Sequence, residues 1–333
     1  MKTYVVTVTY GNRFNFLKQV IDSALNEGIK KIIVVDNNSV TESREKLKAY
    51  ERELGKDKIK VLYLDENYGS AGGYKRGLEE AYNDPDCEFI WLLDDDNVPE
   101  ENALRNLLLA YEYLGKNIYN VLMSLRPIFK DDLLSVQKGR IKGYIKNSFM
   151  GFHIKYYFLD KIFQISNYLN AKIGINSEAV NYKIVKSQIG PYGGLFLHKK
   201  VIENVGYPNE DFFVYADDHD WTLRMTNSGF DLYLCSNSII KDIDVTWLAT
   251  KVKSPFYNSM SNDIKVYYSI RNHVFLDKKF ITNKYVYYLN LYISLFYNYL
   301  FHLFLIPKMA IKRFKIILKA VKDGLNGNLG RFC

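Results

Sequence analysis

The sequence is poor in cysteine. Only Cys87, Cys235 and Cys333 occur among 333 residues, and no two of them have the CxxC spacing of a metal or redox site. We therefore expect neither a disulfide framework nor a zinc site, and this composition fits a reducing, cytoplasmic environment. The first ten residues alternate like a strand and lack the long apolar core of a signal peptide, so we expect a protein that is not exported.

The sequence also lacks an even spread of positive charge. The formal net charge is +8, but residues 126–190 carry 11 Lys and Arg against 4 Asp and Glu, and residues 278–333 carry 10 against 1. The remainder of the chain is acidic. Because a nucleic-acid binder usually presents one basic face, we expect no nucleic-acid partner. Basic segments beside apolar, aromatic sequence indicate contact with an anionic membrane surface.

Strand and helix patterns alternate four times in the first 110 residues. The predicted strands are 4–9, 31–36, 59–64 and 89–93, and helical patterns follow them at 14–26, 41–54, 69–83 and from 99 onward. This alternation predicts an α/β fold with a doubly wound, mainly parallel sheet. We expect a catalytic domain over residues 1–275, with a basic, aromatic insertion at about 126–190, and a basic amphipathic helical region over residues 276–333.

The clearest chemical signal lies at the end of the fourth predicted strand. There an apolar run ends in three consecutive carboxylates, Asp94, Asp95 and Asp96. Asp94 and Asp96 repel each other unless a cation lies between them, and Mg²⁺ usually takes one or two protein carboxylates together with phosphate oxygens. Polar residues also follow the second and third strands, and the carboxyl ends of parallel strands share one ligand-binding edge. The sequence therefore predicts a site for a metal-bound diphosphate.

Five segments in this order resemble a family 2 glycosyltransferase of the GT-A fold. They read VTVTY at 6–10, VVDNNS at 34–39, NYGSAGGYKRG at 67–77, LLDDD at 92–96 and FFVYADDHDWTLR at 212–224. The resemblance covers about residues 3–125 and 187–275, with a GT-A doubly wound sheet and a C-terminal helical extension as its implied architecture. The NYGSAGGYKRG and DDD segments are most similar to the galactofuranosyltransferase and rhamnosyltransferase branch.

The resemblance implies which residues bind the nucleotide-sugar donor. The residues implied to contact the base, line its pocket, follow the diphosphate or face the sugar are Asp36, Thr9, Tyr10, Asn67, Gly72, Gly73, Arg76 and Asp95. Glycine has no Cβ, so backbone amides at such positions can approach a ligand closely, and helix N-termini favour anions. A solvated arginine on the helix surface stays open as the alternative for Arg76.

The resemblance also implies the metal ligands and the base. Asp94 and Asp96 would hold Mn²⁺ or Mg²⁺, which neutralises charge on the leaving nucleoside diphosphate. Transfer with inversion needs a carboxylate that takes the proton of the acceptor hydroxyl, and Asp218 matches the base of the family. We expect the neighbouring Asp217 to raise the pKa of Asp218 by like-charge repulsion.

One feature departs from the family pattern. Related enzymes often place a histidine ligand downstream of the base, but residues 239–247 contain no histidine. Asp242 or Asp244 could take its place, since hard cations accept oxygen ligands.

The acceptor side of the site is implied by a smaller set of residues. Gly193 and Gly194 resemble the loop that precedes the base, with an ordinary turn as the alternative reading. Asp217 lies beside the base on this side. Trp221 would stack on an acceptor sugar, and a core position is the alternative for this residue.

The C-terminal region contains an uncharged segment. Residues 285–306 carry no fixed charge and are long enough to span a bilayer. However, Asn290, Ser294, Asn298 and His302 recur every fourth residue, and residues 308–322 form a basic amphipathic pattern. This combination favours helices that lie in the membrane interface. Packing on the protein's own core or in a homo-oligomer and a true membrane span stay open, and residues 126–190 have no pattern that assigns them a role.

These features together lead to a functional expectation. We expect a metal-dependent, inverting glycosyltransferase that is peripheral on the inner, cytoplasmic face of the cell membrane. It would transfer a hexosyl or deoxyhexosyl group from UDP-galactofuranose, or next dTDP-rhamnose, to a lipid-linked glycan acceptor in cell-surface polysaccharide synthesis. A nucleotidyltransferase and a non-catalytic, membrane-bound scaffold with a glycosyltransferase-like fold stay open as alternatives. A nucleotidyltransferase would need a basic phosphate loop near the first strand, where residues 11–13 are a thin candidate.

Overall fold

The computed structural model describes residues 1–139, 141–159, 183–244 and 262–332. The chain forms two compact units. The first contains Met1–Lys142 and Asn181–Ala249, and the second contains Gly143–Val180 and Thr250–Cys333. These units are a different division from the functional regions expected at residues 1–275 and 276–333, which stay predictions.

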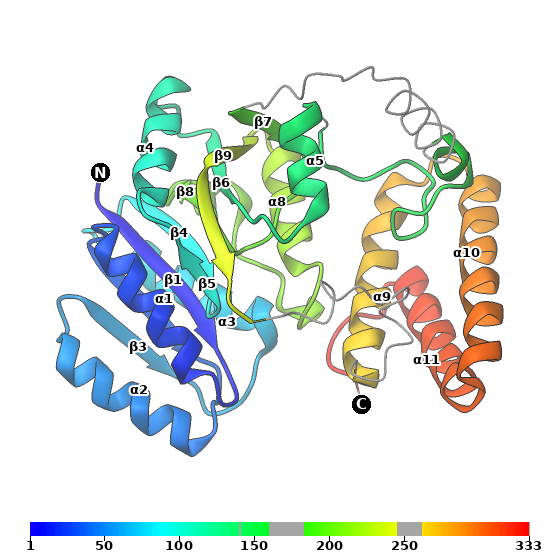
Figure 1. The fold of residues 1–333 in the computed structure, drawn as a ribbon, viewed down its shortest axis with the longest axis horizontal. Helices are drawn as coiled ribbons and strands as arrows, with labels where there is room; N and C mark the ends of the chain where they lie inside the picture. The colour runs from blue at the N-terminus through cyan, green and yellow to red at the C-terminus, as the bar shows by residue number, and fades with distance from the viewer. Residues whose placement is uncertain (140, 160–182, 245–261, 333) are drawn as a thin grey trace, which may run out of the picture. The chain divides into compact units, whose positions relative to one another are not determined.

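The first unit is built on a mixed sheet of nine strands among the described residues (Figure 1). The strand order is β3-β2-β1-β4-β8-β6-β9-β5, and β7 also pairs with β9. The strands at one side of this order are parallel to one another, whereas β8 is antiparallel to both of its neighbours. The strand bounds are β1 (Thr3–Thr9), β2 (Lys31–Asp36), β3 (Ile59–Tyr63), β4 (Phe89–Asp94), β5 (Asn97–Pro99), β6 (Asn120–Leu125), β7 (Ile184–Ser187), β8 (Leu195–His198) and β9 (Asp231–Asp242).

Helices cover both faces of this sheet. Residues of α1, α2 and α4 pack in the core on one face, and residues of α3, α7 and α8 pack in the core on the other. The helix bounds in this unit are α1 (Phe14–Asn26), α2 (Thr41–Leu54), α3 (Gly69–Asn83), α4 (Ala103–Tyr113), α5 (Lys130–Lys138), α7 (Val201–Val205) and α8 (Asp217–Asn227), with the short 3₁₀ helix η1 at Glu210–Phe212. The expected doubly wound α/β architecture is therefore confirmed.

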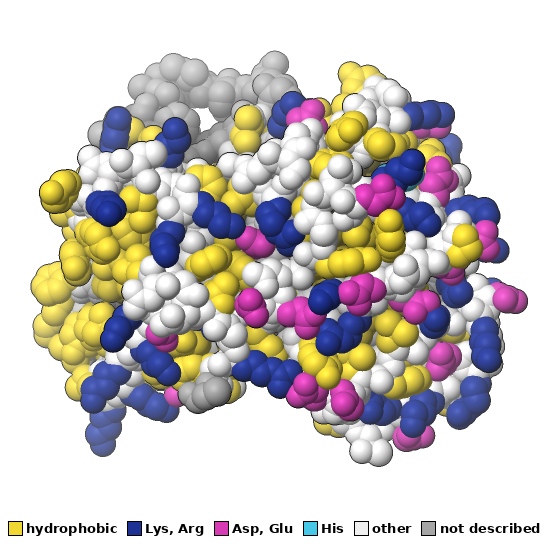
Figure 2. Space-filling model, turned by 180° about the vertical axis from the view of Figure 1, so that it is seen from behind, with side chains coloured by type: hydrophobic (Ala, Val, Ile, Leu, Met, Phe, Trp, Pro, Cys, Tyr) yellow, Lys and Arg dark blue, Asp and Glu magenta, His cyan; other side chains and the backbone are white. Residues whose placement is uncertain are grey.

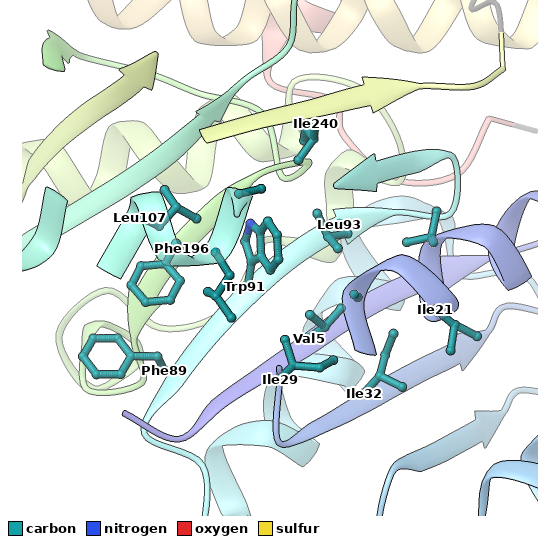
Figure 3. Close-up of a cluster of buried hydrophobic side chains, with 14 of the residues drawn as sticks. Val5, Ile21, Ile29, Ile32, Phe89, Trp91, Leu93, Leu107, Phe196 and Ile240 are labelled. Carbon is teal, nitrogen blue, oxygen red and sulfur yellow. The ribbon is translucent and has the colours of Figure 1, made fainter. Parts of the chain in front are cut away.

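The strand sequences explain this two-sided burial. Successive side chains of a strand point to opposite faces, so Val5 and Trp91 lie in one core while Val6 and Leu92 lie in the other. Figure 3 shows the first of these cores, where Trp91 and Leu93 of β4 lie among Val5, Phe196 and other apolar side chains. Burying one such side chain fully contributes roughly 1.5–3 kcal/mol. Both cores fix the position of β4, the strand that carries Asp94 at its end.

The strand register aligns the ends of three parallel strands. Thr9 at the end of β1 pairs with Asp36 at the end of β2, and Val8 pairs with Asp94 at the end of β4. The polar residues that follow these strands therefore emerge at one edge of the sheet, as the alternation of strands and helices predicts.

The second unit contains three long helices in its described part. They are α9 (Asp263–Asp277), α10 (Lys284–Leu305) and α11 (Pro307–Asn326), and a 3₁₀ turn, η3 (Lys278–Phe280), follows α9. Helix α11 approaches α9 so closely that a Cβ on Gly324 would lie 2.4 Å from the carbonyl oxygen of Arg271. Tyr267 donates to Asp323 at 2.7 Å between the same two helices. Both uncharged and basic C-terminal segments are therefore helical, as expected.

The polar stripe of α10 faces the protein interior. Asn290 and His302 are buried; the Asn290 amide accepts from the backbone of Ile154 at 3.0 Å and donates to the carbonyl of Asn147 at 2.8 Å. The outward surface of the helix consequently consists of large apolar residues, among them Tyr285, Tyr292, Phe296, Tyr297 and Phe304. Figure 2 shows an area of hydrophobic side chains, in yellow, on the left, which is the side of α10 in that view. No helix in the described part of the chain combines the length and the apolar character that crossing a bilayer requires.

Candidate active site

A first arginine lies among the carboxylates at the edge of the sheet. Arg13, at the start of α1, donates through Nε to Asp95 at 2.9 Å, through Nη2 to Asp96 at 2.9 Å and through Nη1 to Asp244 at 2.5 Å. Thr9 donates its hydroxyl to Asp95 at 2.7 Å. Asp95 thus points to the end of β1, and the loop after β1 supplies much of the charge that offsets this acidic cluster.

A second arginine lies on the other side of the same cluster. Arg126 directly follows β6 and is buried. Its Nη1 donates to Asp94 at 3.3 Å, and its Nε and Nη2 donate to the two carboxylate oxygens of Asp242, the Nε at 3.2 Å. Asn97 donates to both Asp96 and Asp242, at 3.2 and 3.1 Å. Neither arginine was predicted as part of the site, because its carboxylate partners lie between 32 and 231 positions away along the chain.

The carboxylates strongly affect one another. Burial raises the pKa of Asp94; Arg126 opposes this shift, and Asp242 and Asp218 add to it. Burial and the neighbouring Asp94 and Asp95 raise the pKa of Asp96 to about 7. Burial also raises the pKa of Asp95 against the opposing effect of Arg13. Burial and mutual repulsion disfavour the charged form of these carboxylates. A cation that binds them would reduce this repulsion.

The donor set of this cluster fits a hard divalent cation that also binds phosphate. Asp94 and Asp96 supply oxygen ligands, and the Asp94 side chain keeps 35% of its surface exposed. Within the described residues, no group of three or more His, Cys, Asp or Glu side chains could hold a metal on its own. Two carboxylates suffice for Mg²⁺ when substrate phosphates complete its shell. Asp242 lies in this cluster and Asp244 contacts Arg13, and their expected roles as ligands stay predictions.

The backbone of Gly193 lies directly beside the Asp94 side chain. A Cβ at this position would lie 2.0 Å from Oδ1 of Asn97 and 2.6 Å from Oδ2 of Asp94. Any side chain here would therefore displace a predicted metal ligand. The neighbouring Gly194 has a φ of +93°, a backbone conformation that glycine adopts without strain. These two glycines give the turn before β8 its close approach to the carboxylates.

The segment expected along the donor has well-defined packing. A Cβ on Gly73 would lie 2.5 Å from Cγ1 of Val8, and one on Gly72 would lie 2.6 Å from Cβ of Tyr68. Both glycines are therefore required by the fit of α3 against its surroundings, whatever they contribute to a ligand. Arg76 donates to Glu210 at 3.1 Å, and its guanidinium lies 3.9 Å from the centre of the Tyr68 ring.

The residues predicted to bind the nucleobase of the donor are held in place largely by contacts within the protein. Asp36 is fully buried and accepts hydrogen bonds from the backbone of Ser39 at 2.9 Å and from the Arg44 side chain. Asn67 accepts from the backbone of Gly69 at 2.8 Å. Tyr10 is exposed at the end of β1. The structure thus brings Thr9, Tyr10 and Asp36 to adjoining strand ends, and their contacts with a nucleotide stay predictions.

The predicted catalytic carboxylate begins a helix. Asp218 lies in the first turn of α8, is partly exposed and accepts from the backbone of His219 at 2.7 Å. Burial and the adjacent Asp218 raise the pKa of Asp217 to about 8. The hydroxyl of Ser70 donates to Asp217 at 2.7 Å. The expected effect of this repulsion on the pKa of Asp218 stays a prediction.

The chain that leads into α8 is strained. Phe213, Tyr215 and Ala216 all have positive φ values, of 64°, 67° and 61°, which non-glycine residues rarely adopt. Gly69 lies so close to this segment that a Cβ on it would be 1.9 Å from the carbonyl oxygen of Phe213. Strain of this kind persists only where the surrounding structure enforces it and is typical of functional sites. No local sequence pattern predicts these positive φ values.

Trp221 occupies a core position. It is fully buried, and its indole Nε1 donates to the carbonyl of Gly206 at 2.8 Å. This is the alternative that the sequence left open, and it removes the basis for stacking on an acceptor sugar. Asp220 and Arg224 form an ion pair at 3.0 Å on the same helix.

Comparisons with known proteins agree with this architecture. Residues 4–168 match the family model described as Glycosyl transferase family 2. The crystal structure of GalNAc-T7 with UDP, GalNAc and Mn²⁺ is similar at 13% identity and a TM-score of 0.57, over 84% of this chain and 48% of that one. Mannosyltransferase PcManGT from Pyrobaculum calidifontis, in complex with GDP-Man and Mn²⁺, is similar at 13% identity and a TM-score of 0.54, over 96% and 75%. Residues 4–168 therefore match the family 2 glycosyltransferase model, and the chain has a fold similar to that of these two GT-A structures.

The chain spans about half, 48%, of the length of GalNAc-T7. No curated protein matches the sequence.

Proposed function

We propose that this protein is a metal-dependent, inverting glycosyltransferase that uses a nucleotide-diphosphate sugar. The observation that carries the proposal is the joint placement of Asp94, Asp96 and Asp218: Asp218 lies near enough to Asp94 to raise its pKa. The proposed metal ligand Asp94 and the proposed base Asp218 are thus close enough to interact electrostatically. The two structures of similar fold were solved with Mn²⁺ and a nucleotide or nucleotide sugar, which supports this choice of donor and metal.

The roles of the residues follow from their positions. When bound, Mn²⁺ or Mg²⁺ would stabilise the negative charge of the departing nucleoside diphosphate, and Asp94 and Asp96 would hold it. Asp218 would accept the proton of the acceptor hydroxyl as the new glycosidic bond forms. Arg13 and Arg126 keep the surrounding carboxylates in place by neutralising their charge. Gly193 leaves the space beside Asp94 free of a side chain.

Two finer parts of the proposal concern the donor and the acceptor. Galactofuranose is favoured as the transferred sugar and rhamnose is next, because residues 67–77 and 93–96 resemble the enzymes that transfer these sugars. A lipid-linked glycan is the proposed acceptor, in cell-surface polysaccharide synthesis. It would bring the reaction to a membrane, which fits the apolar outward surface of α10 and the basic residues of α11.

We further propose that the protein attaches peripherally to the inner face of the cell membrane. Monomeric soluble proteins rarely expose apolar patches larger than a few hundred Å², yet α10 exposes Tyr285, Phe296, Tyr297 and Phe304 along its length. Lysines of α11 would add attraction to anionic lipid, each contributing about 1 kcal/mol. A homo-oligomer that covers the same surface is the competing outcome, and sedimentation of the protein without lipid would reveal it.

Release of nucleoside diphosphate from a panel of nucleotide sugars tests the proposed activity. The panel should include UDP-galactofuranose and dTDP-rhamnose, each with Mn²⁺ or with EDTA, and with and without a lipid-linked glycan. Release from one donor that needs Mn²⁺ and increases with acceptor supports the proposal and identifies the sugar. No release from any donor with acceptor present would favour the non-catalytic scaffold, and release of pyrophosphate would favour nucleotidyl transfer.

A further inference from the structure

Helices α10 and α11 enclose a groove that the proposed reaction does not use. The groove has a volume of about 930 Å³, within the usual range for sites that bind small molecules. Its apolar lining includes Leu291 and Phe296 from α10 and Phe314 and Leu318 from α11. Figure 1 shows the two helices as an antiparallel pair in the second unit. The groove therefore runs along a helical hairpin whose two sides are both apolar.

The two ends of the groove differ in charge. Lys278, Lys284 and Lys322 line one end, where α10 begins and α11 approaches its end. Phe296 and Phe314 line the other end. The groove thus has one cationic end and one aromatic end.

The three lysines are available for a ligand. All three side chains are exposed, and within the described residues none of them forms an ion pair. The described lining contains no Asp or Glu. A lysine cluster without acidic partners attracts an anionic group. The adjacent apolar surface favours a ligand that also has an apolar part over a simple anion.

The length of the groove suits a hydrocarbon chain. Lys284 and Phe296 are separated by 12 positions on one helix, which corresponds to about 18 Å along the helix axis. The lining residues of α10 recur at helical spacing over this distance, so they form one continuous face. An extended chain with an anionic head at one end matches both the charge and the shape.

We infer that this groove binds one acyl chain of an anionic membrane phospholipid, with the lipid phosphate at Lys278, Lys284 and Lys322. This inference rests on the proposed membrane attachment and makes it specific, since a single lipid would lie between α10 and α11 beside the exposed apolar face of α10. Burying the hydrocarbon of the chain drives binding, and the lysines select the anionic head. The groove is distinct from the carboxylate site in the first unit.

The test uses the full-length protein and a short-chain phosphatidylglycerol kept below its critical micelle concentration. Calorimetry should show one lipid bound per chain, with much weaker binding of inorganic phosphate and of phosphatidylcholine with the same chains. Lys284→Ala and Lys322→Ala should each weaken binding about fivefold. Lys315→Ala is the matched control, because Lys315 is an exposed lysine of α11 outside the groove. This variant should leave binding of the monomeric lipid unchanged.

A second pair of variants tests the apolar part of the groove. Leu318→Trp adds bulk to the lining and should weaken lipid binding at least tenfold. Ile311→Trp makes the same change outside the groove, at a residue with nearly the same exposure, 47% against 46%, and should have no such effect. Thermal unfolding of both variants checks that they fold.

Three results would overturn the inference. They are equal binding of inorganic phosphate and phosphatidylglycerol, equal losses in Lys315→Ala and Lys322→Ala, or binding to anionic vesicles without any binding of the monomeric lipid. The last result would be consistent with membrane attachment and would disprove only the binding of a lipid in the groove. Because calorimetry is done without donor or metal, failure here is separable from failure of glycosyl transfer.

Discussion

At the scale of single residues, Asp218 is the proposed catalytic base. Asp218→Asn keeps the shape of the side chain and removes its ability to accept a proton. Turnover should fall by a factor of roughly 10²–10⁴, the usual contribution of general base catalysis, while donor binding is retained. Steady-state release of nucleoside diphosphate and calorimetric donor binding measure the two effects. Asp231→Asn, at an exposed carboxylate on β9, is the control, and wild-type turnover in Asp218→Asn would remove Asp218 from the mechanism.

Arg126 is the residue whose loss should be most costly. Arg126→Met removes a buried cation and leaves Asp94 and Asp242 without its charge. Breaking a buried ion pair on one side typically costs 3–5 kcal/mol, so we expect about 3 kcal/mol less free energy of unfolding. The loss should be smaller at pH 5 than at pH 8, because burial raises the pKa of Asp94 and protonation of this carboxylate relieves its unpaired charge. Urea unfolding at both pH values measures this, and an equal loss at both would contradict the electrostatic explanation.

Asp217 predicts a pH dependence of stability. Its pKa is about 8 in the folded protein and near 3.9 in an unfolded chain, so between these values the folded state holds a proton that the unfolded state has lost. The contribution of Asp217 to the free energy of unfolding is therefore fully present below pH 4. It is lost as the pH rises toward 8, by at most about 1.4 kcal/mol for each pH unit. Asp217→Asn should flatten the stability profile over this interval. A profile identical to that of the wild type would show that Asp217 is ionised in the fold.

At the scale of elements, helix α3 packs tightly against strand β1 near the site. Gly73→Ala would place a methyl group 2.5 Å from Cγ1 of Val8, and overpacking of this kind costs roughly 1–3 kcal/mol. The double variant Gly73→Ala with Val8→Ala should recover part of that loss, because it creates the missing space. Chemical unfolding measures both. If Gly73→Ala weakens donor binding without changing stability, the glycine serves the ligand instead of the packing.

Helix α10 makes a separate prediction about the membrane. Tyr285 is 89% exposed on α10, and Tyr285→Glu should weaken binding to anionic vesicles without lowering the unfolding temperature. Tyr113, which is 80% exposed on α4, provides the matched control in Tyr113→Glu. Vesicle sedimentation measures the difference. Equal behaviour of the two variants would contradict attachment through α10.

At the scale of the whole molecule, the parallel part of the sheet was predictable from sequence, whereas its antiparallel part was not. Buried parallel strands are continuous apolar runs separated by helices, and the predicted strands at 4–9, 31–36 and 59–64 agree with β1, β2 and β3 to within one residue. The antiparallel strands β5 and β7 are only three and four residues long. Such short strands are defined by their partner β9, and no local pattern specifies that pairing.

The candidate site shows the same division between local and distant information. The run of carboxylates at residues 94–96 is visible in sequence because it ends a strong strand. The roles of Arg13 and Arg126 were not visible, because their partners Asp244 and Asp242 lie 231 and 116 positions away. The inward orientation of Asn290 on α10 was hidden for a similar reason, since it depends on the backbone of Asn147.

The central claim is that Asp94 and Asp96 hold a metal-bound nucleotide sugar for transfer. The most direct measurement is Mn²⁺-dependent release of nucleoside diphosphate by the wild type and by Asp94→Asn and Asp96→Asn, with thermal unfolding as the check on folding. The account predicts release by the wild type that EDTA abolishes and Mn²⁺ restores, and a loss of at least a hundredfold in each folded variant. Release that survives EDTA, or that is unchanged in both variants, would contradict it.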